Sequence, residues 1–349
     1  MKNNRYWEDR VNQLLADNQK QATQDILRIN KAYEKALKDI QHDINQIFLK
    51  YTAGHNLTVT QAKSLLNSKM DNFMHPILRR IYPRLKEGRL KDWCLAELNA
   101  NAYKARITRL EALKKSIKLH CLEVYEQELK LSTRNYIKTI KEAYYRTCYD
   151  FQKGINLAFD VASINKRAVD MLLKQEWLGR NYSASVWNNT QALVDKLDET
   201  ITRGFLSGKS LKEISKELAD LTEFGMFAAE RLVRTETTFF TNQAALMGYK
   251  EVGIEKYVYV ATLDKKTCSC EKHGKKSCGE LDRKVFVIKD KKVGVNCPPM
   301  HPFCRCTVRS YINDEILNRA KRRARNPETG KTYLVDNMSY KEWKKQYAT

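Results

Sequence analysis

Apolar side chains recur every three or four residues through much of the first half of the chain. In the N-terminal stretch these positions are Ile26, Ile29, Tyr33, Leu37, Ile40, Ile44 and Ile47, and further along they are Ile137, Ile140, Tyr144, Cys148, Phe151 and Ile155. This spacing is that of an α-helix with one apolar face. Because such faces usually pack against other helices, the sequence predicts long helices of a bundle or coiled coil over residues 5–50 and 87–177.

The positions of proline and of helix-capping residues also indicate a mainly helical chain. The six prolines are Pro76, Pro83, Pro298, Pro299, Pro302 and Pro327, so more than 200 consecutive residues contain none. Proline breaks helices, and helix-dominated segments are the ones that run so long without it. Thr58 with Gln61, and Ser210 with Glu213, have the spacing of capping boxes, which predicts that a helix begins at each.

The second half of the chain predicts shorter elements. Residues 183–250 are expected to form three helices, with Gly225 and Gly248 near the ends of the last one. After Gly253 the chain becomes rich in β-branched and aromatic residues, which predicts short strands at 256–262, 284–289 and 293–296.

These patterns define a fold class and a domain organisation. The chain is predicted to be mainly α, with a long-helical domain over residues 1–177. An α+β module with a small antiparallel sheet and a Cys/His-rich loop region is expected over 178–312. A basic C-terminal tail over 313–349 would complete the chain.

The charge is strongly positive and unevenly distributed. The 349 residues include 63 Lys and Arg against 41 Asp and Glu, a net charge of +22. Residues 151–260 hold 14 basic and 14 acidic side chains, so the whole excess lies on either side of them. Such an excess attracts polyanions through counterion release. Charge for general solubility is the plainer explanation, and a membrane surface would require an amphipathic basic helix that the sequence does not clearly contain.

The charge also suggests where double-stranded DNA would bind. The candidate contacts form one basic cluster, made of Arg319, Lys321, Arg322, Arg323 and Arg325. No run of 18 apolar residues occurs and the N-terminus has no apolar signal region, so the sequence predicts neither a membrane span nor a secretory signal.

Six of the nine cysteines lie between Cys268 and Cys306. Thiols and imidazoles in two groups about twenty residues apart are typical of a tetrahedral zinc site. The candidate ligands are Cys268, Cys278, Cys304 and Cys306, with His301 as the replacement for one cysteine and Cys270 next. The alternatives are reduced cysteines that only pack within a loop, or a catalytic site of a metal-dependent nuclease or thiol enzyme. Cys94, Cys121 and Cys148 are expected to be small buried apolar residues.

A second charged group lies on the helix around residues 228–249. Arg234 and Glu236 there are more readily explained by a buried ion pair that ties the helix to the sheet module than by an active-site carboxylate. Gly330-Lys331-Thr332 lacks the earlier glycine of a phosphate-binding loop, so it does not indicate an NTPase.

Several segments together resemble a known family. They are the helical run from Trp177 to Leu218, then RLVRTET, NQAA, YVATLDKKTC, CGELDRKVF, GVNCPPMHPFCRC, NPETGKTY and YKEW. In this order they resemble the phage minor head protein family typified by phage Mu protein F, over residues 176–346. The family's signature falls here on Arg234, Glu236, Asp264, Thr267, Cys268, Cys278, Asp282, Phe286, Pro298, Pro299, His301, Pro302, Cys304, Arg305 and Cys306. Two features depart from it: the insert SCEKHGKKS separates Cys268 from Cys278, and Arg283 replaces the usual glycine.

The resemblance implies a virion component of a tailed phage rather than an enzyme. Such a protein would assemble in the cytoplasm of the bacterial host, associate with portal protein and with capsid or scaffolding protein, and contact packaged DNA inside the capsid or near the portal. Relatives of this module also occur fused to toxin domains. The alternatives are a metal-dependent nuclease or toxin-like domain, and a plain non-specific DNA-binding protein.

Overall fold

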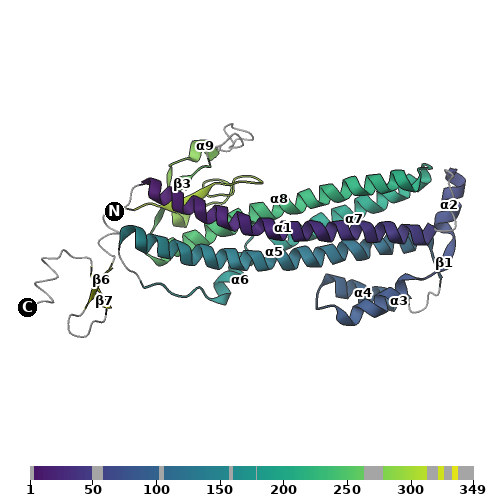
Figure 1. The fold of residues 1–349 in the computed structure, drawn as a ribbon, viewed down its shortest axis with the longest axis horizontal. Coiled ribbons are helices and arrows are strands. Elements are labelled where there is room, and N and C mark those ends of the chain that lie inside the picture. The colour runs from purple at the N-terminus through teal and green to yellow at the C-terminus, as the bar shows by residue number, and fades with distance from the viewer. Residues whose placement is uncertain are drawn as a thin grey trace, which may run out of the picture. The chain divides into compact units, whose positions relative to one another are not determined.

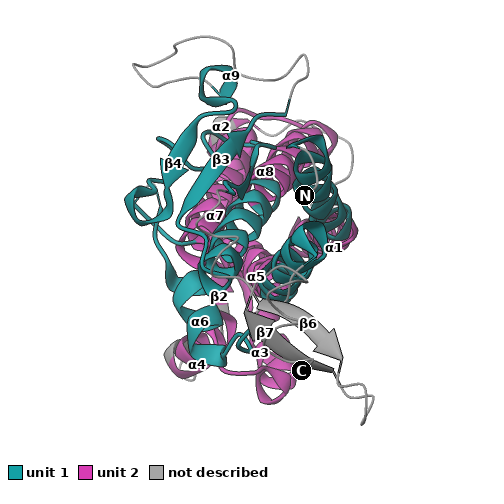
Figure 2. Cartoon of the chain, turned by 90° about the vertical axis from the view of Figure 1, so that its left-hand side faces the viewer, with its two compact units in different colours: residues 1–23, 134–181, 233–349 teal, residues 24–133, 182–232 magenta. Residues whose placement is uncertain are grey.

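The computed structural model describes residues 4–48, 58–101, 106–156, 160–177, 179–262, 278–312, 321–325 and 332–336. Two compact units are present (Figure 2). Unit 1 comprises residues 1–23, 134–181 and 233–349, and unit 2 comprises residues 24–133 and 182–232. Each unit is therefore built from segments that are distant in the sequence, and the boundaries at 177 and 312 stay a prediction.

The longest helices in the described residues are α1 (Asn4–Phe48), α5 (Arg109–Ile155), α7 (Tyr182–Leu206) and α8 (Leu211–Glu251) (Figure 1). The mainly helical fold class is confirmed, and α1 matches the helix predicted over 5–50. Within the described residues, no helix combines the length and the apolar character that a membrane crossing needs.

The apolar period had predicted long helices over residues 87–177, but the structure divides this region into shorter elements around one long helix. It contains α4 (Arg89–Asn101), strand β2 (Arg106–Thr108), α5 and then α6 (Lys166–Lys174). Strand β2 pairs antiparallel with β1 (Lys69–Asp71), which separates α4 from α5. Asn165 starts α6, because its side chain accepts a hydrogen bond from the backbone N–H of Ala168 at 2.8 Å.

The prediction of three short helices over 183–250 is wrong, since this stretch forms only α7 and the 41-residue α8. Gly225 lies inside α8 instead of ending a helix. A Cβ there would lie 2.9 Å from Tyr33 Cε1 and 3.2 Å from Leu193 Cδ2, so the glycine permits close packing within unit 2. The capping boxes at Thr58 and Ser210 are present, and they begin α2 (Val59–Asn67) and α8.

Unit 2 also contains a small helical core. Helix α3 (Met74–Ile81), a 3₁₀ turn (Tyr82–Arg84) and α4 pack against α5. The fully buried members are Met74, Leu78, Leu90, Cys94, Leu119 and Leu122. Cys94, Cys121 and Cys148 are all buried free thiols, as predicted.

A three-stranded antiparallel sheet in unit 1 has the order β4-β3-β5, with β3 (Lys256–Val260) in the centre, β4 (Val285–Val287) and β5 (Thr307–Ser310). The first two strands were predicted, but the third strand is not at 293–296. That segment is a tight turn, because the N–H groups of Val295, Asn296 and Cys297 all bond to the carbonyl of Lys292. The short helix α9 (Cys278–Leu281) and a 3₁₀ turn (Ile288–Asp290) complete this module.

The C-terminal tail contains a second antiparallel pair that the sequence did not predict. Strand β6 (Lys321–Arg325) pairs with β7 (Thr332–Asp336).

Candidate functional site

Three thiols and one imidazole come together beside the sheet of unit 1. Cys278 opens α9, and Cys304 and Cys306 lie directly before β5. Their Sγ atoms are all within 4.8 Å of one another, and each residue is at most 3% exposed. His301 Nε2 lies 3.4 Å from Cys278 Sγ. The structure therefore brings together four of the six candidate ligands, while Cys268 and Cys270 lie outside the described residues.

The orientation of the imidazole is fixed by its other nitrogen. His301 Nδ1 lies 2.8 Å from the carbonyl oxygen of Pro302, which can only accept a hydrogen bond. The proton is therefore placed on Nδ1, and the lone pair of Nε2 is directed toward the thiols. The backbone N–H of Cys304 bonds back to the carbonyl of His301 at 3.1 Å, and Phe303 between them has a left-handed φ of 59°.

Helix α8 holds the thiol-bearing loop through three polar side chains on one of its faces. The hydroxyl of Thr235 accepts from the N–H of Phe303 at 3.0 Å, and Thr238 donates to the carbonyl of Cys304 at 2.7 Å. The amide of Asn242 donates to the carbonyl of Cys306 at 3.2 Å. These bonds fix the backbone of the loop, so the thiols are positioned before any ligand binds.

The surroundings of the thiols are apolar. Tyr259, Ala261 and Leu281 are buried with them, and Phe286 and Met300 pack alongside. Hydrogen bonds that the Cys304 thiol donates to Cys278 and Cys306, together with burial, raise the pKa of Cys304 well above its usual range. Ionising several thiols at once in such a place is costly, unless a bound cation neutralises their charge.

The remaining signature residues have mostly structural positions. Asp282 accepts a hydrogen bond from the N–H of Ala261 at 2.9 Å, next to the sheet. Pro298 and Pro299 are joined by a cis peptide bond, and the carbonyl of Arg305 accepts from Thr262. Asp264, Thr267 and Arg319 lie outside the described residues, and strand β6 holds Lys321, Arg322, Arg323 and Arg325.

Glu236, one of the residues considered for an ion pair on α8, has a neutral partner in the structure. Among the residues that the structure describes, Glu236 is paired with the indole N–H of Trp177, at 3.0 Å, and with no cation. Its side chain is buried, and this burial raises the pKa of Glu236 to about 7, although the hydrogen bond from Trp177 acts in the opposite direction. Neutral hydrogen bonds that involve Thr235, Thr238 and Asn242 connect the helix and the loop.

The sequence did not single out these three side chains or Cys297. Their signal is visible in retrospect, since Thr235, Thr238 and Asn242 are three and four residues apart, which is the spacing of one helix face. Cys297 is fully buried and receives a hydrogen bond from the amide of Gln243 at 3.6 Å. It is not a member of the thiol cluster.

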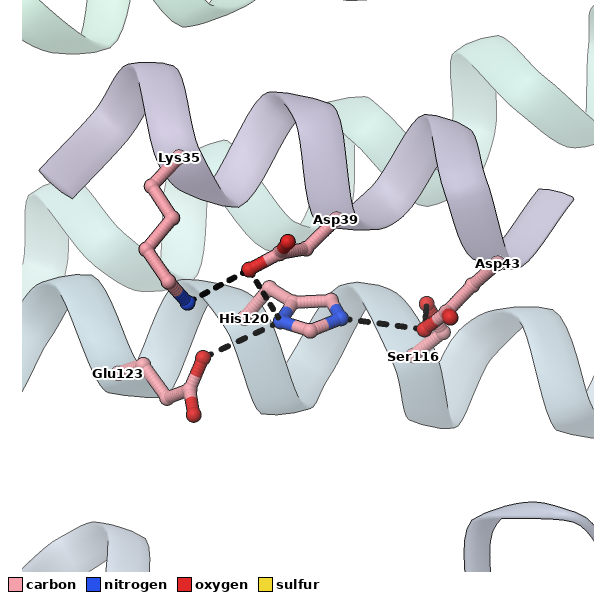
Figure 3. A network of polar contacts seen from close by, with 6 residues as sticks. All are labelled: Lys35, Asp39, Asp43, Ser116, His120 and Glu123. Carbon is pink, nitrogen blue, oxygen red and sulfur yellow. Dashed lines mark hydrogen bonds and ion pairs between the residues drawn. The ribbon is translucent and has the colours of Figure 1, made fainter. Parts of the chain in front are cut away.

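A second cluster of ionisable groups lies in unit 2, between α1 and α5 (Figure 3). His120 Nε2 is 3.1 Å from Asp43 Oδ2, and its Nδ1 is 3.2 Å from Glu123 Oε2 and 3.9 Å from Asp39 Oδ2. The ammonium of Lys35 lies 2.7 Å from the same oxygen of Asp39. The carboxylates are thus paired with side-chain cations, and we interpret the cluster as an ion network that joins two helices.

Part of the chain is similar to known proteins. Residues 195–309, which contain the thiol cluster and its support on α8, match the model of the "Phage Mu protein F like protein" family. The chain therefore contains a Mu F-like segment over these residues. The resemblance noted in the sequence is confirmed for this Mu F-like segment.

Two curated relatives show different extents of similarity. Minor head protein GP7 of Bacillus phage SPP1 is 23% identical over 342 residues, which is 93% of this chain and 93% of that protein. NAD(+)–arginine ADP-ribosyltransferase EFV of Enterococcus faecalis (strain ATCC 700802 / V583) is 26% identical over 222 residues. That match covers 59% of this chain but only 42% of the relative, so more than half of the transferase lies outside it. No solved structure matches the chain significantly.

Proposed function

We propose that the chain is a structural minor head protein of a tailed phage, which assembles with portal protein and with capsid or scaffolding protein. The observation that carries this proposal is the similarity to minor head protein GP7 of Bacillus phage SPP1, which extends over 93% of both chains. A match of that extent includes the helical N-terminal half as well as the Mu F-like segment. The similarity therefore extends beyond the Mu F-like segment.

Mass spectrometry of purified virions tests this role directly. We expect the protein in the virion, inside the capsid or near the portal, after assembly in the host cytoplasm. A tagged chain should also co-purify with portal protein from infected cells. Its presence in infected cells but not in virions would contradict the proposal.

We propose further that the protein contacts packaged double-stranded DNA without sequence preference. The net charge of +22 supports this contact, since its excess lies outside residues 151–260. The logarithm of the binding constant should fall linearly with the logarithm of salt concentration, by about 0.9 for each phosphate neutralised. Replacing the five residues Arg319, Lys321, Arg322, Arg323 and Arg325 with alanine should make the slope shallower. Binding that is absent at low salt, or insensitive to salt, would refute the DNA contact.

The enzymatic alternative has its own test. A metal-dependent nuclease would cut DNA in the presence of a divalent cation and lose that activity in a His301→Ala variant. We expect no cutting by the purified chain, because the proposed function is structural. Cutting that depends on His301 would replace the structural role with an enzymatic one.

A further inference from the structure

The thiol cluster in unit 1 has the composition of a metal site. Three Sγ atoms lie within 4.8 Å of one another, and the imidazole Nε2 of His301 lies 3.4 Å from one of them, that of Cys278, so four donors from two segments of the chain lie at or beside one place. Three thiolates and one imidazole are a usual ligand set for structural zinc, which prefers four soft or borderline donors in a tetrahedron. We propose that Cys278, His301, Cys304 and Cys306 bind one structural zinc ion.

The outer contacts of these donors support a metal site. His301 gives its Nδ1 proton to a backbone carbonyl, which is how metal-binding histidines are commonly oriented. Thr238 and Asn242 of α8 donate hydrogen bonds to the backbone carbonyl groups of Cys304 and Cys306, respectively. The imidazole of His301 and the backbone that carries Cys304 and Cys306 are therefore held by contacts outside the cluster, which favours a preorganised site.

The position of the cluster explains what zinc would do. Cys278 belongs to α9, whereas Cys304 and Cys306 precede β5, so a shared ion would connect both ends of the segment 278–306. The apolar contacts there are few, and a small module of this kind is commonly stabilised by metal. Binding displaces the thiol protons, and the ion stabilises only the folded chain. This inference concerns the stability of the Mu F-like segment and does not depend on the proposed role in the phage head.

The purified full-length chain tests the proposal without any mutation. Protein produced in zinc-containing medium should carry about one zinc per chain by elemental analysis. Removing the ion with a chelator should lower the midpoint of thermal unfolding, and adding zinc back should restore it. Less than a tenth of an equivalent of zinc, with a melt that ignores both chelator and added zinc, would overturn the proposal.

Cobalt substitution identifies the ligands even in variants that are less stable. Co²⁺ in a tetrahedral site with thiolates gives visible d–d bands and a near-ultraviolet thiolate charge-transfer band. The charge-transfer band should weaken by about a third in Cys278→Ser, and zinc content should drop severalfold in Cys304→Ser and Cys306→Ser. Cys297→Ser is the matched control, because Cys297 is equally buried in the same module but lies outside the cluster. Equal loss in Cys297→Ser would contradict the assignment.

The fourth ligand is tested separately. His301→Ala should lower zinc affinity at least tenfold, and His301→Cys should recover most of it, because it supplies another soft donor. A double variant with Cys268→Ser and Cys270→Ser should keep one zinc per chain. Loss of zinc in that double variant, with full retention in His301→Ala, would show that the fourth ligand is not His301.

Discussion

Burial changes the pKa of single side chains in this protein, and through it the dependence of stability on pH. Glu236 has its pKa raised by burial from 4.5 to about 7, so the folded chain binds this proton more tightly than the unfolded chain does. A carboxyl whose folded pKa is raised disfavours folding once the pH exceeds the unfolded value, and the cost increases until the pH passes about 7. Glu236 is therefore a source of instability at neutral and alkaline pH.

A Glu236→Gln variant should remove that cost. Its amide oxygen can still accept the hydrogen bond from Trp177, and it has no charge to bury. We expect near-equal stability at pH 4 and a gain on the order of 2 kcal/mol for the variant at pH 8. Urea unfolding at both pH values measures the difference. The exposed Glu223 on the same helix is the control, and a Glu236→Gln variant that is less stable at pH 8 would contradict the argument.

The sequence could nominate the site residues but not their partners. Residue type and order were enough to include Cys278, His301, Cys304 and Cys306 among the six candidate zinc ligands. Cysteines and histidines gathered in two such groups are uncommon in a helical chain. The partner of Glu236 could not be named, since Trp177 lies 59 residues away and its indole replaces the expected cation. Long-range neutral hydrogen bonds leave no periodic signal in a sequence.

At the scale of elements, His120 joins α1 and α5 through charge. Burial lowers the pKa of His120, but the hydrogen bonds and charges of Asp43 and Glu123 outweigh it and raise the pKa from 6.5 to about 9. A histidine with a raised folded pKa stabilises the fold fully below its unfolded pKa, and the effect is lost as pH rises through 9. The network is thus predicted to strengthen the α1–α5 contact in unit 2 at neutral and mildly acidic pH.

A His120→Gln variant should reveal this dependence. At pH 6 we expect it to be less stable than the parent by on the order of 2 kcal/mol, because Asp39, Asp43 and Glu123 lose their shared cation. The deficit should shrink as the pH is raised to 10. The exposed His42 on α1 supplies the control, since His42→Gln should have the same small effect at both pH values. A deficit that does not change with pH would disprove the role of the charge.

Helix positions were predicted well where the apolar residues repeat at helical spacing without interruption. They were predicted poorly where long-range packing decides where a helix begins or ends. The period of apolar residues located α1 within a few residues. It did not show the break at β2, because the pairing of β2 with β1 depends on a segment almost forty residues earlier in the chain. Gly225 suggested a helix end, but its role is to bring α8 close to Tyr33, which a local pattern does not reveal.

For the whole molecule, the order of segments within the units predicts how fragments behave. Unit 2 needs residues 182–232 as well as 24–133, and unit 1 needs residues 233–349 as well as two earlier segments. A fragment of residues 1–177 would therefore contain the apolar faces of α1 and α5 without the parts of α7 and α8 that belong to the same units. Buried polar groups such as Asn18, which bonds to Thr241, would also lose their partners.

The fragment 1–177 should be helical by circular dichroism but should unfold without a sharp thermal transition. Helices of this length form locally, whereas cooperative unfolding requires the packed core that the missing segments complete. Co-expression with the fragment 178–349 should restore a single sharp transition near that of the intact chain. A sharp transition in the fragment 1–177 alone would instead show that the N-terminal half folds independently, as the predicted boundary at residue 177 implies.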